Sequence, residues 1–93
     1  MGIRSNGIDI HCEISGSGPW LTLSHSLCCD GSMWAPQMAA LEARFTVLRF
    51  DTRGHGGSDA PAGAYSFEPL THDVLGLLAA LQIERTHFCG LSM

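Results

Sequence analysis

Residues 50–59 read Phe50-Asp51-Thr52-Arg53-Gly54-His55-Gly56-Gly57-Ser58-Asp59, directly after a β-rich run over 45–50. The stretch holds a carboxylate, a guanidinium, an imidazole and a hydroxyl, which invites a catalytic interpretation. We interpret it as structural, because its glycines permit tight turns and because Asp51 and Arg53 can hold a loop by charge-assisted hydrogen bonds. We expect this loop to run from the end of the strand to Gly63.

Two further strands and a helix are predicted before this loop. Apolar and polar residues alternate over Ile8–Ser15, as in a half-buried strand, and Trp20–Ser24 is an apolar run typical of a strand covered on both faces. A short turn separates these two, so we expect the first strand to pair antiparallel at a sheet edge. Apolar residues at helical spacing predict a helix over Trp34–Arg44, with Pro36 tolerated in its first turn.

A second helix and a fourth strand follow the loop. Apolar residues recur at three- and four-residue steps from Phe67 to Leu81, which predicts an amphipathic helix with Ser66 as its N-cap and close packing at Gly76. Thr86–Cys89 is a short β-rich run. Strands that alternate with helices predict an α/β fold, a mostly parallel sheet flanked by helices on both faces.

The last strand leads into Gly90-Leu91-Ser92-Met93, the first four positions of the Gly-x-Ser-x-Gly nucleophile elbow. In that motif a tight strand-to-helix turn lifts the serine hydroxyl clear of the sheet, so Ser92 is the candidate nucleophile. The oxyanion donors would be the backbone N–H groups of Met93 and of Leu27, which lies in the loop after the second strand. The His25 side chain is expected to bond nearby backbone instead.

These motifs together resemble a known family. The pattern Asp-x-Arg-Gly-His-Gly-x-Ser at 51–58, the Ser-His-Ser-Leu run at 24–27 and the segments 33–34, 36–38 and 87–93 resemble the α/β-hydrolases, in particular the 3-oxoadipate enol-lactonase branch, over essentially all 93 residues. The resemblance implies a small acidic enol-lactone substrate from aromatic-ring catabolism, and no triad member within 51–58. The family also includes esterases, cofactor-free perhydrolases and carbon–carbon bond hydrolases. An Asp-nucleophile dehalogenase is disfavoured, because residue 92 is Ser.

The order of the catalytic residues limits what this chain does by itself. In α/β-hydrolases the nucleophile precedes the acid and the histidine, and all the histidines here precede Ser92 (His11, His25, His55, His72, His87). We therefore expect residues 1–93 to be the N-terminal part of a single core domain, without its cap, C-terminal strands, triad acid and histidine. Its partner would be the C-terminal complement of the same protein. A truncated fragment and a short binding module are the other interpretations of where the chain stops.

The hypothesis for function is a serine hydrolase that cleaves a carboxylic ester or lactone by acyl transfer once the complement is present, the 93 residues alone being inactive. The alternative is an inactive fragment, or a non-catalytic relative, that binds a ligand or a protein. No metal and no organic cofactor is implied. The net charge of −4 with five scattered arginines argues against nucleic acid, and no apolar run approaches the ~20 residues needed to cross a membrane.

The four cysteines show no Cys-x-x-Cys spacing. We expect Cys12 and Cys89 to be reduced core residues, which indicates a reducing compartment and hence a cytoplasmic protein. Cys28 and Cys29 stand where the family usually has glycine and a small polar residue, which puts the geometry of the oxyanion loop in question. We expect them to pack partly buried, since no cation lies close in sequence to make either thiol reactive.

Overall fold

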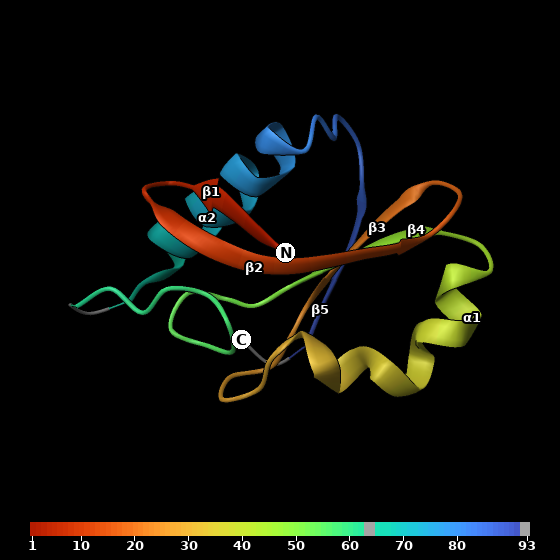
Figure 1. The fold of residues 1–93 in the computed structure, drawn as a ribbon, viewed down its shortest axis with the longest axis horizontal. Helices are drawn as coiled ribbons and strands as arrows, with labels where there is room; N and C mark the ends of the chain where they lie inside the picture. Colours follow the sequence, from red (N-terminus) through yellow and green to blue (C-terminus); the bar gives the residue numbers. More distant parts are fainter. Residues whose placement is uncertain (63–64, 92–93) are drawn as a thin grey trace.

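The computed structural model describes residues 1–62 and 65–91, drawn as a ribbon in Figure 1. Their strands form one five-stranded sheet in the order β1-β2-β4-β3-β5. The strands are β1 (Gly2–Ser5), β2 (Ile8–Gly16), β3 (Trp20–Ser24), β4 (Thr46–Phe50) and β5 (His87–Gly90). The predicted α/β class is confirmed, and each predicted strand has a counterpart within a residue or two.

The sheet is mixed. β3 pairs in parallel with both β4 and β5, whereas β2 pairs antiparallel with β4 and with β1. The predicted antiparallel pairing of the first strand is confirmed, but its partners are β1 and β4 and not the strand that follows it. Its predicted place at a sheet edge is wrong, because β1 occupies that edge. The connecting turn crosses the start of β4, where Thr46 donates its N–H to Pro19 O. A Cβ at Gly16 or Gly18 would lie 2.3 Å from a backbone oxygen of that segment, so only glycine lets the chain cross there.

β1, which was not predicted from the sequence, covers the outer edge of β2. A hairpin joins the two strands through Asn6 and Gly7, whose φ values are 50° and 82°. Positive φ at both central residues is the requirement of a type I′ turn, and Asn-Gly is its preferred pair. β1 pairs with the first half of β2 and β4 pairs with the second half, so the nine residues of β2 serve two neighbours.

The helical segments differ in how well they were predicted. The expected helix over Trp34–Arg44 is a 3₁₀ helix, η1 (Gly31–Gln37), continued by a short α1 (Met38–Glu42). Pro36 lies inside η1, where a missing N–H and the proline ring oppose α-helical hydrogen bonding. α2 (Phe67–Ala80) is confirmed, and Ser66 occupies its N-cap position in extended backbone but makes no capping hydrogen bond with its side chain.

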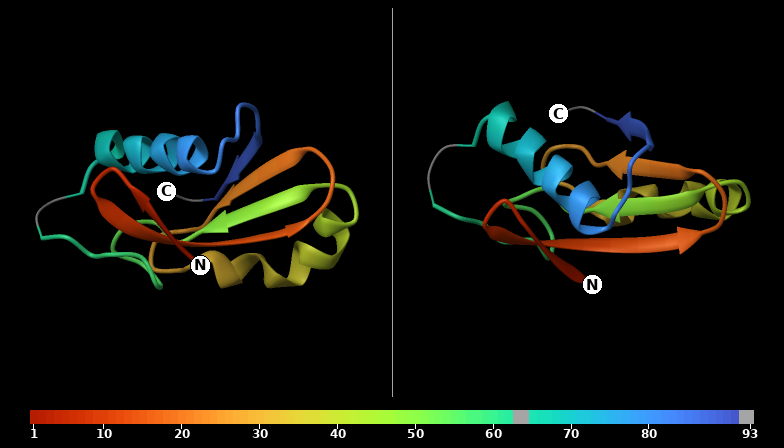
Figure 2. Two further views of the ribbon diagram at one scale, coloured as in Figure 1. Left: turned by 45° about the horizontal axis from the view of Figure 1, so that its top comes forward. Right: turned by 90° about the horizontal axis from the view of Figure 1, so that it is seen from above.

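Helices cover the sheet on two faces, with α2 on one side and η1–α1 on the other (Figure 2). Successive side chains of β4 point to opposite faces of the sheet, so Val47 packs toward η1–α1 whereas Leu48 and Phe50 pack toward α2. The core under α2 consists of Ile8, Ile10, Cys12, Leu48, Phe50, Leu77 and Ile83, and the core under η1–α1 of Leu21, Leu23, Met38 and Val47. In the part of the chain that the structure describes, no helix is long and apolar enough to span a bilayer.

An ion pair joins the loop after β4 to α2. Arg53 donates from Nε to Asp73 Oδ2 at 2.6 Å and from Nη2 to Asp73 Oδ1 at 2.7 Å. The two side chains are only 12% and 5% exposed, and the hydrogen bonds to Asp73 raise the pKa of Arg53 above its usual value. Asp73 Oδ1 also accepts a hydrogen bond from Asn6 Nδ2 at 2.9 Å. The carboxylate of α2 is thus bonded both to the loop after β4, through Arg53, and to the N-terminal hairpin, through Asn6.

The cysteine predictions hold at one site and fail at three. Cys12 is fully buried, as predicted, whereas Cys28, Cys29 and Cys89 are exposed. Cys89 is exposed because β5 is the edge strand of the described sheet and each of its residues is exposed. Cys28 has φ of 64°, a left-handed conformation that glycine adopts at little cost and cysteine does not. The backbone at position 28 is thus one suited to glycine.

The buried pair leads to a prediction for stability. Arg53→Met leaves the Asp73 carboxylate unpaired in a site that is 5% exposed, so we expect the free energy of unfolding to fall by about 3 kcal/mol. Adding Asp73→Asn removes the buried charge while keeping an acceptor for Asn6, and should recover part of that loss. Urea denaturation measures both. Arg4→Met is the matched control, because its ion pair with Asp9 is exposed and should contribute less than ~1 kcal/mol. Equal losses for Arg53→Met and Arg4→Met would contradict this account.

The left-handed backbone at Cys28 leads to a second prediction. Cys28→Gly removes the steric cost of positive φ and should raise the free energy of unfolding by about 1 kcal/mol. Cys29 is the matched neighbour, since it is also exposed and is not among the residues with positive φ. Cys29→Gly should lower the stability by about 0.5 kcal/mol through the entropy of the unfolded chain. Changes of the same sign in the two variants would show that φ at position 28 is not strained.

Candidate active site

The parallel strands β3, β4 and β5 finish at the same end of the sheet, and the segments that follow them start there. The parallel register pairs Ser24 at the end of β3 with Phe50 of β4 on one side and with Gly90 of β5 on the other. The chain leaves β3 toward η1–α1 and leaves β4 toward α2, and these helices lie on opposite faces of the sheet (Figure 2). Such a divergence at the carboxyl ends of parallel strands opens a crevice in which α/β sheets bind ligands.

The end of β5 lies beside the end of β3. The N–H of Leu91 donates to Ser24 O at 3.3 Å, which continues the pairing one residue beyond Gly90. Two predicted site residues, Ser92 and Met93, lie outside the described residues. The last described residue, Leu91, is therefore the one immediately before the predicted nucleophile. It lies beside the end of β3, where the loop that contains Leu27 begins.

His25 fixes the start of this loop. Its side chain is fully buried, and its Nε2 accepts a hydrogen bond from the N–H of Thr52 at 2.9 Å. Nε2 therefore carries no proton, so Nδ1 is the protonated nitrogen and donates to Ser26 O at 2.7 Å. The prediction that His25 bonds nearby backbone is confirmed. Through Thr52 it also joins the loop after β3 to the loop after β4, which the sequence analysis did not predict.

Leu27 lies on the outside of the loop. Its side chain is among the exposed large apolar residues, at 63%. The N–H of Cys29 donates to Ser26 O and closes a tight turn around positions 26–29. Within residues 1–62 and 65–91, no hydrogen bond uses the N–H of Leu27. That group is therefore not committed to the described part of the fold.

The Asp51 carboxylate is enclosed by backbone N–H groups. Its Oδ1 accepts from Gly31 N at 2.7 Å and its Oδ2 from Gly57 N at 2.9 Å, and the residue is 6% exposed. Ser58 Oγ donates to Asp51 O and accepts from His11 N, which ties the same loop to β2. Each polar group of Asp51 thus has a structural partner. The interpretation of residues 51–58 as a structural loop is confirmed for this residue and for Arg53, which Asp73 holds.

Two neighbouring hollows of about 240 and 200 Å³ lie at this edge of the sheet and share Thr52, Phe67 and Leu70. Ser24 and Phe88 line the first, and the second is lined by Leu27, Arg53, His55, Tyr65 and Ser66. Most of the side chains in the first hollow are apolar. The guanidinium in the second is already paired with Asp73, so these hollows offer an apolar rather than a cationic surface to a ligand.

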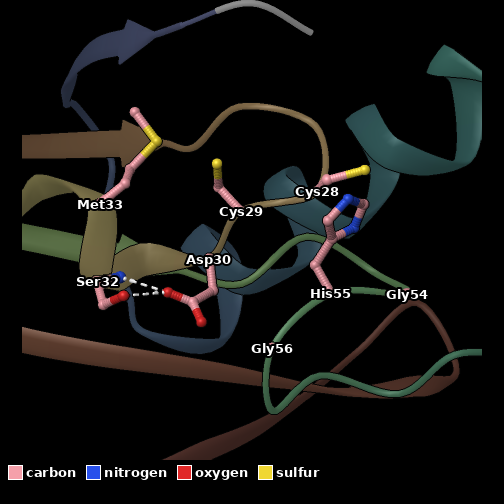
Figure 3. A pocket seen from close by; sticks show the side chains of 8 residues that line it. All are labelled: Cys28, Cys29, Asp30, Ser32, Met33, Gly54, His55 and Gly56. Carbon is pink, nitrogen blue, oxygen red and sulfur yellow. Dashed lines mark hydrogen bonds between the residues drawn. The ribbon is translucent and has the colours of Figure 1, made fainter.

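A third hollow of about 480 Å³ lies between the loop after β3 and the loop after β4 (Figure 3). It is lined by Cys28, Cys29, Asp30, Ser32, Met33, Gly54, His55 and Gly56. The described residues contain no group of three or more His, Cys, Asp or Glu side chains arranged to hold a metal ion.

One structural residue of the site was missed although the sequence contained a signal for it. Asp73 lies at helical spacing from Leu70 and Leu77, on the apolar face of α2, where a charge needs a partner. Arg53, in a loop already expected to form charge-assisted hydrogen bonds, is that partner. The chemistry of both residues was visible in the sequence, but their pairing across 20 positions was not.

Comparison with known proteins supports this geometry. The profile of the alpha/beta hydrolase fold family matches residues 19–93. The 3-oxoadipate enol-lactonase 1 of Acinetobacter baylyi is 44% identical over 89 residues, which are 94% of this chain and 33% of that protein. A fluoroacetate dehalogenase of a Burkholderia species is 39% identical over 88 residues, which are 89% of this chain and 29% of that protein.

Solved structures give the same result. The enol-lactonase from Burkholderia xenovorans superposes with a TM-score of 0.97 at 55% identity, covering 100% of this chain and 37% of that one. Epoxide hydrolase A from Mycobacterium thermoresistibile superposes with a TM-score of 0.91 at 32% identity, covering 99% and 30%. The chain spans about a third of the length of the relatives it matches. Since the family profile covers most of its residues, the chain belongs to the α/β-hydrolase fold family.

Proposed function

We propose that residues 1–93 are the N-terminal part of the core domain of a serine hydrolase, which cleaves a carboxylic ester or lactone once a C-terminal segment completes it. The observation that carries this proposal is the register of β3 and β5. Ser24 pairs with Gly90 and accepts a hydrogen bond from Leu91, so the peptide that precedes Ser92 emerges beside the loop that holds Leu27.

In the proposed reaction the Ser92 hydroxyl attacks the substrate carbonyl and forms an acyl-enzyme, which water then hydrolyses. The N–H groups of Leu27 and Met93 hold the developing oxyanion. Among the described residues no acceptor takes the N–H of Leu27, and this supports its role, because an oxyanion donor must not be consumed by the fold. The base and its acid come from the completing segment, as the order of the triad requires.

The histidines near the site support an external base. Both ring nitrogens of His25 are engaged with backbone groups, one at 2.7 Å and one at 2.9 Å. His87 begins β5, three residues before Gly90, which places it about 10 Å from the edge where the strands end. His55 is held through Nδ1 by Arg53 O at 3.1 Å, and what argues against it as the base is the order of the triad, in which the histidine follows the nucleophile.

The relatives support a small lactone as substrate, since two of them are 3-oxoadipate enol-lactonases. The dehalogenase and epoxide hydrolase relatives widen the range of the family, but a serine at position 92 favours acyl transfer. Substrates of the enol-lactone type from aromatic-ring catabolism are acidic. The Arg53 guanidinium at the hollows is neutralised by Asp73, so in this proposal the cation that recognises the acid belongs to the completing segment.

The completing segment is also the proposed partner of the chain. β5 is an edge strand whose residues are all exposed, and the adjoining surface presents large apolar side chains (Phe67, Leu75, Phe88, Leu91). An open edge beside an apolar surface is a surface that folded proteins normally cover. We further propose that the complete protein is cytoplasmic, which fits the four free cysteines of residues 1–93.

A chimera tests the proposal directly. Residues 1–93 are joined to the part of the Burkholderia xenovorans enol-lactonase that follows its matched region, since the two chains superpose with a TM-score of 0.97. We expect a fluorophosphonate probe to label Ser92 and the chimera to hydrolyse a small ester. Ser92→Ala should abolish labelling and lower the rate about 10³-fold or more.

The isolated chain is the essential comparison. Without the completing segment it lacks the proposed base, so the probe should not label it. Labelling of the isolated chain at Ser92 would contradict an external base. A chimera that folds, as judged by a cooperative thermal transition, but is neither labelled nor active would favour the non-catalytic binding module.

The oxyanion role of Leu27 has its own test in the chimera. Leu27→Pro removes the N–H and should lower kcat by about 10²-fold or more. Leu27→Ala keeps the N–H, and because the side chain is exposed, it should leave kcat within a few-fold of the parent. Similar losses of kcat in both variants, with unchanged thermal midpoints, would contradict a backbone donor at this position.

A further inference from the structure

Two adjacent thiols face solvent beside the candidate site and have no role in the proposed reaction. Cys28 and Cys29 are both exposed, and both line the hollow of about 480 Å³ between the two loops. We propose that this pair is a binding site for soft electrophiles that bond two thiols at once, the chemical class being the trivalent organoarsenicals. The site goes beyond the proposed hydrolase function and does not depend on it.

The geometry of adjacent residues favours a bridging ligand over a disulfide. Successive Cα atoms across a trans peptide lie about 3.8 Å apart, shorter than the roughly 4.4–6.8 Å that disulfides span. A direct sulfur–sulfur bond between Cys28 and Cys29 is therefore strained, and both cysteines are free in the structure. A bridging arsenic atom adds one atom and two long bonds to the ring, which relieves that constraint.

The two side chains are free to turn toward one ligand. In Figure 3 the Cys28 side chain lies on the His55 side of the hollow and the Cys29 side chain on the Met33 side. Rotation about the Cα–Cβ bonds of two exposed residues costs little, and the proposal requires that it turn both sulfur atoms toward one ligand. The product, with one arsenic on two sulfurs, is uncharged, so the site needs no compensating charge.

The other sulfur atoms of the described residues are less suited to this ligand. Cys12 is fully buried, and burial raises the pKa of its thiol, which keeps it protonated. Cys89 is exposed but stands alone on β5. The Met33 thioether already accepts a hydrogen bond from the N–H of Ser26 at 3.2 Å. The adjacent pair is thus the one place in residues 1–62 and 65–91 where two exposed thiols are consecutive in the chain.

The binding step is balanced without a redox partner. Phenylarsine oxide reacts with two thiols, so that two S–As bonds form while the As–O bond breaks. The two thiol protons leave with the oxygen as one water, and the arsenic stays trivalent throughout. The mass of the chain should rise by one phenylarsenic group less two hydrogens.

Intact-mass measurement of the 93-residue chain with phenylarsine oxide tests the site. We expect one adduct per chain that survives excess 2-mercaptoethanol and is released by dithiothreitol, because only a dithiol competes with a two-thiol site. Cys28→Ser and Cys29→Ser should each lower the adduct retained in monothiol about 10²-fold, since the second bond is intramolecular. Cys89→Ser is the matched control with another exposed cysteine and should retain the adduct in full.

Each other outcome overturns the proposal. An adduct that persists in Cys28→Ser or Cys29→Ser, or one lost in Cys89→Ser, would place the ligand on another pair of thiols. No monothiol-resistant adduct in the parent chain would show that the two sulfur atoms do not reach one arsenic. Circular dichroism of each variant confirms that a loss of adduct is not a loss of fold.

Discussion

The carboxylate of Asp51 is the constraint on which the site geometry depends. It lies at the end of β4 and accepts one N–H from Gly31, at the start of η1, and another from Gly57, in the following loop. A buried carboxylate is stable only when such donors replace its water, so the two backbone segments must converge on it. The loops after β3 and β4 therefore take their shapes together and not separately.

The glycines of this loop follow from that convergence. A Cβ at Gly56 would lie 2.3 Å from Asp51 Oδ2, and φ at Gly56 is 49°, so a side chain would both displace the carboxylate and strain the backbone. His25 adds a second tie, since its buried ring accepts the N–H of Thr52, the residue next to Asp51. Leu27 stands two residues after His25, so the position of its N–H is set by contacts that do not involve its own side chain.

The sequence was sufficient for the local elements and insufficient for pairings between distant ones. The strands β3 and β4 and the helix α2 were predictable, because their apolar patterns match the period of the structure that buries them. The hairpin at Asn6-Gly7 had a clear signal that was overlooked. The placement of β4 between β2 and β3 was not predictable from adjacency in the chain, since it depends on a turn that passes closely over the start of β4. The prediction that Cys89 is buried was wrong, because an edge strand is covered by a neighbouring strand on one side only.

The same distinction holds for the site. Ser92, Leu27 and Met93 were proposed from the motif and the resemblance, and the described register supports their proximity without reaching residue 92. The partners of Asp51 and Arg53, and the bond of His25 to the N–H of Thr52, could not be assigned from the sequence. Each lies 20 or more positions away, or binds through backbone N–H groups, which carry no residue signature.

The β4 side and the β5 side of the described fold are held by different kinds of contact. Near β4, buried carboxylates accept hydrogen bonds from fixed donors, as Asp51 does from Gly31 and Asp73 from Arg53. Near β5, the exposed surface is apolar and contains no comparable buried pair among the described residues. Charge pairs fix orientation, whereas apolar surface supplies affinity for whatever covers it. In the proposed hydrolase, contacts of the first kind would keep the loop that holds Leu27 preorganised, while the completing segment would dock through the second kind. Electrostatic stabilisation of a transition state depends on such preorganisation.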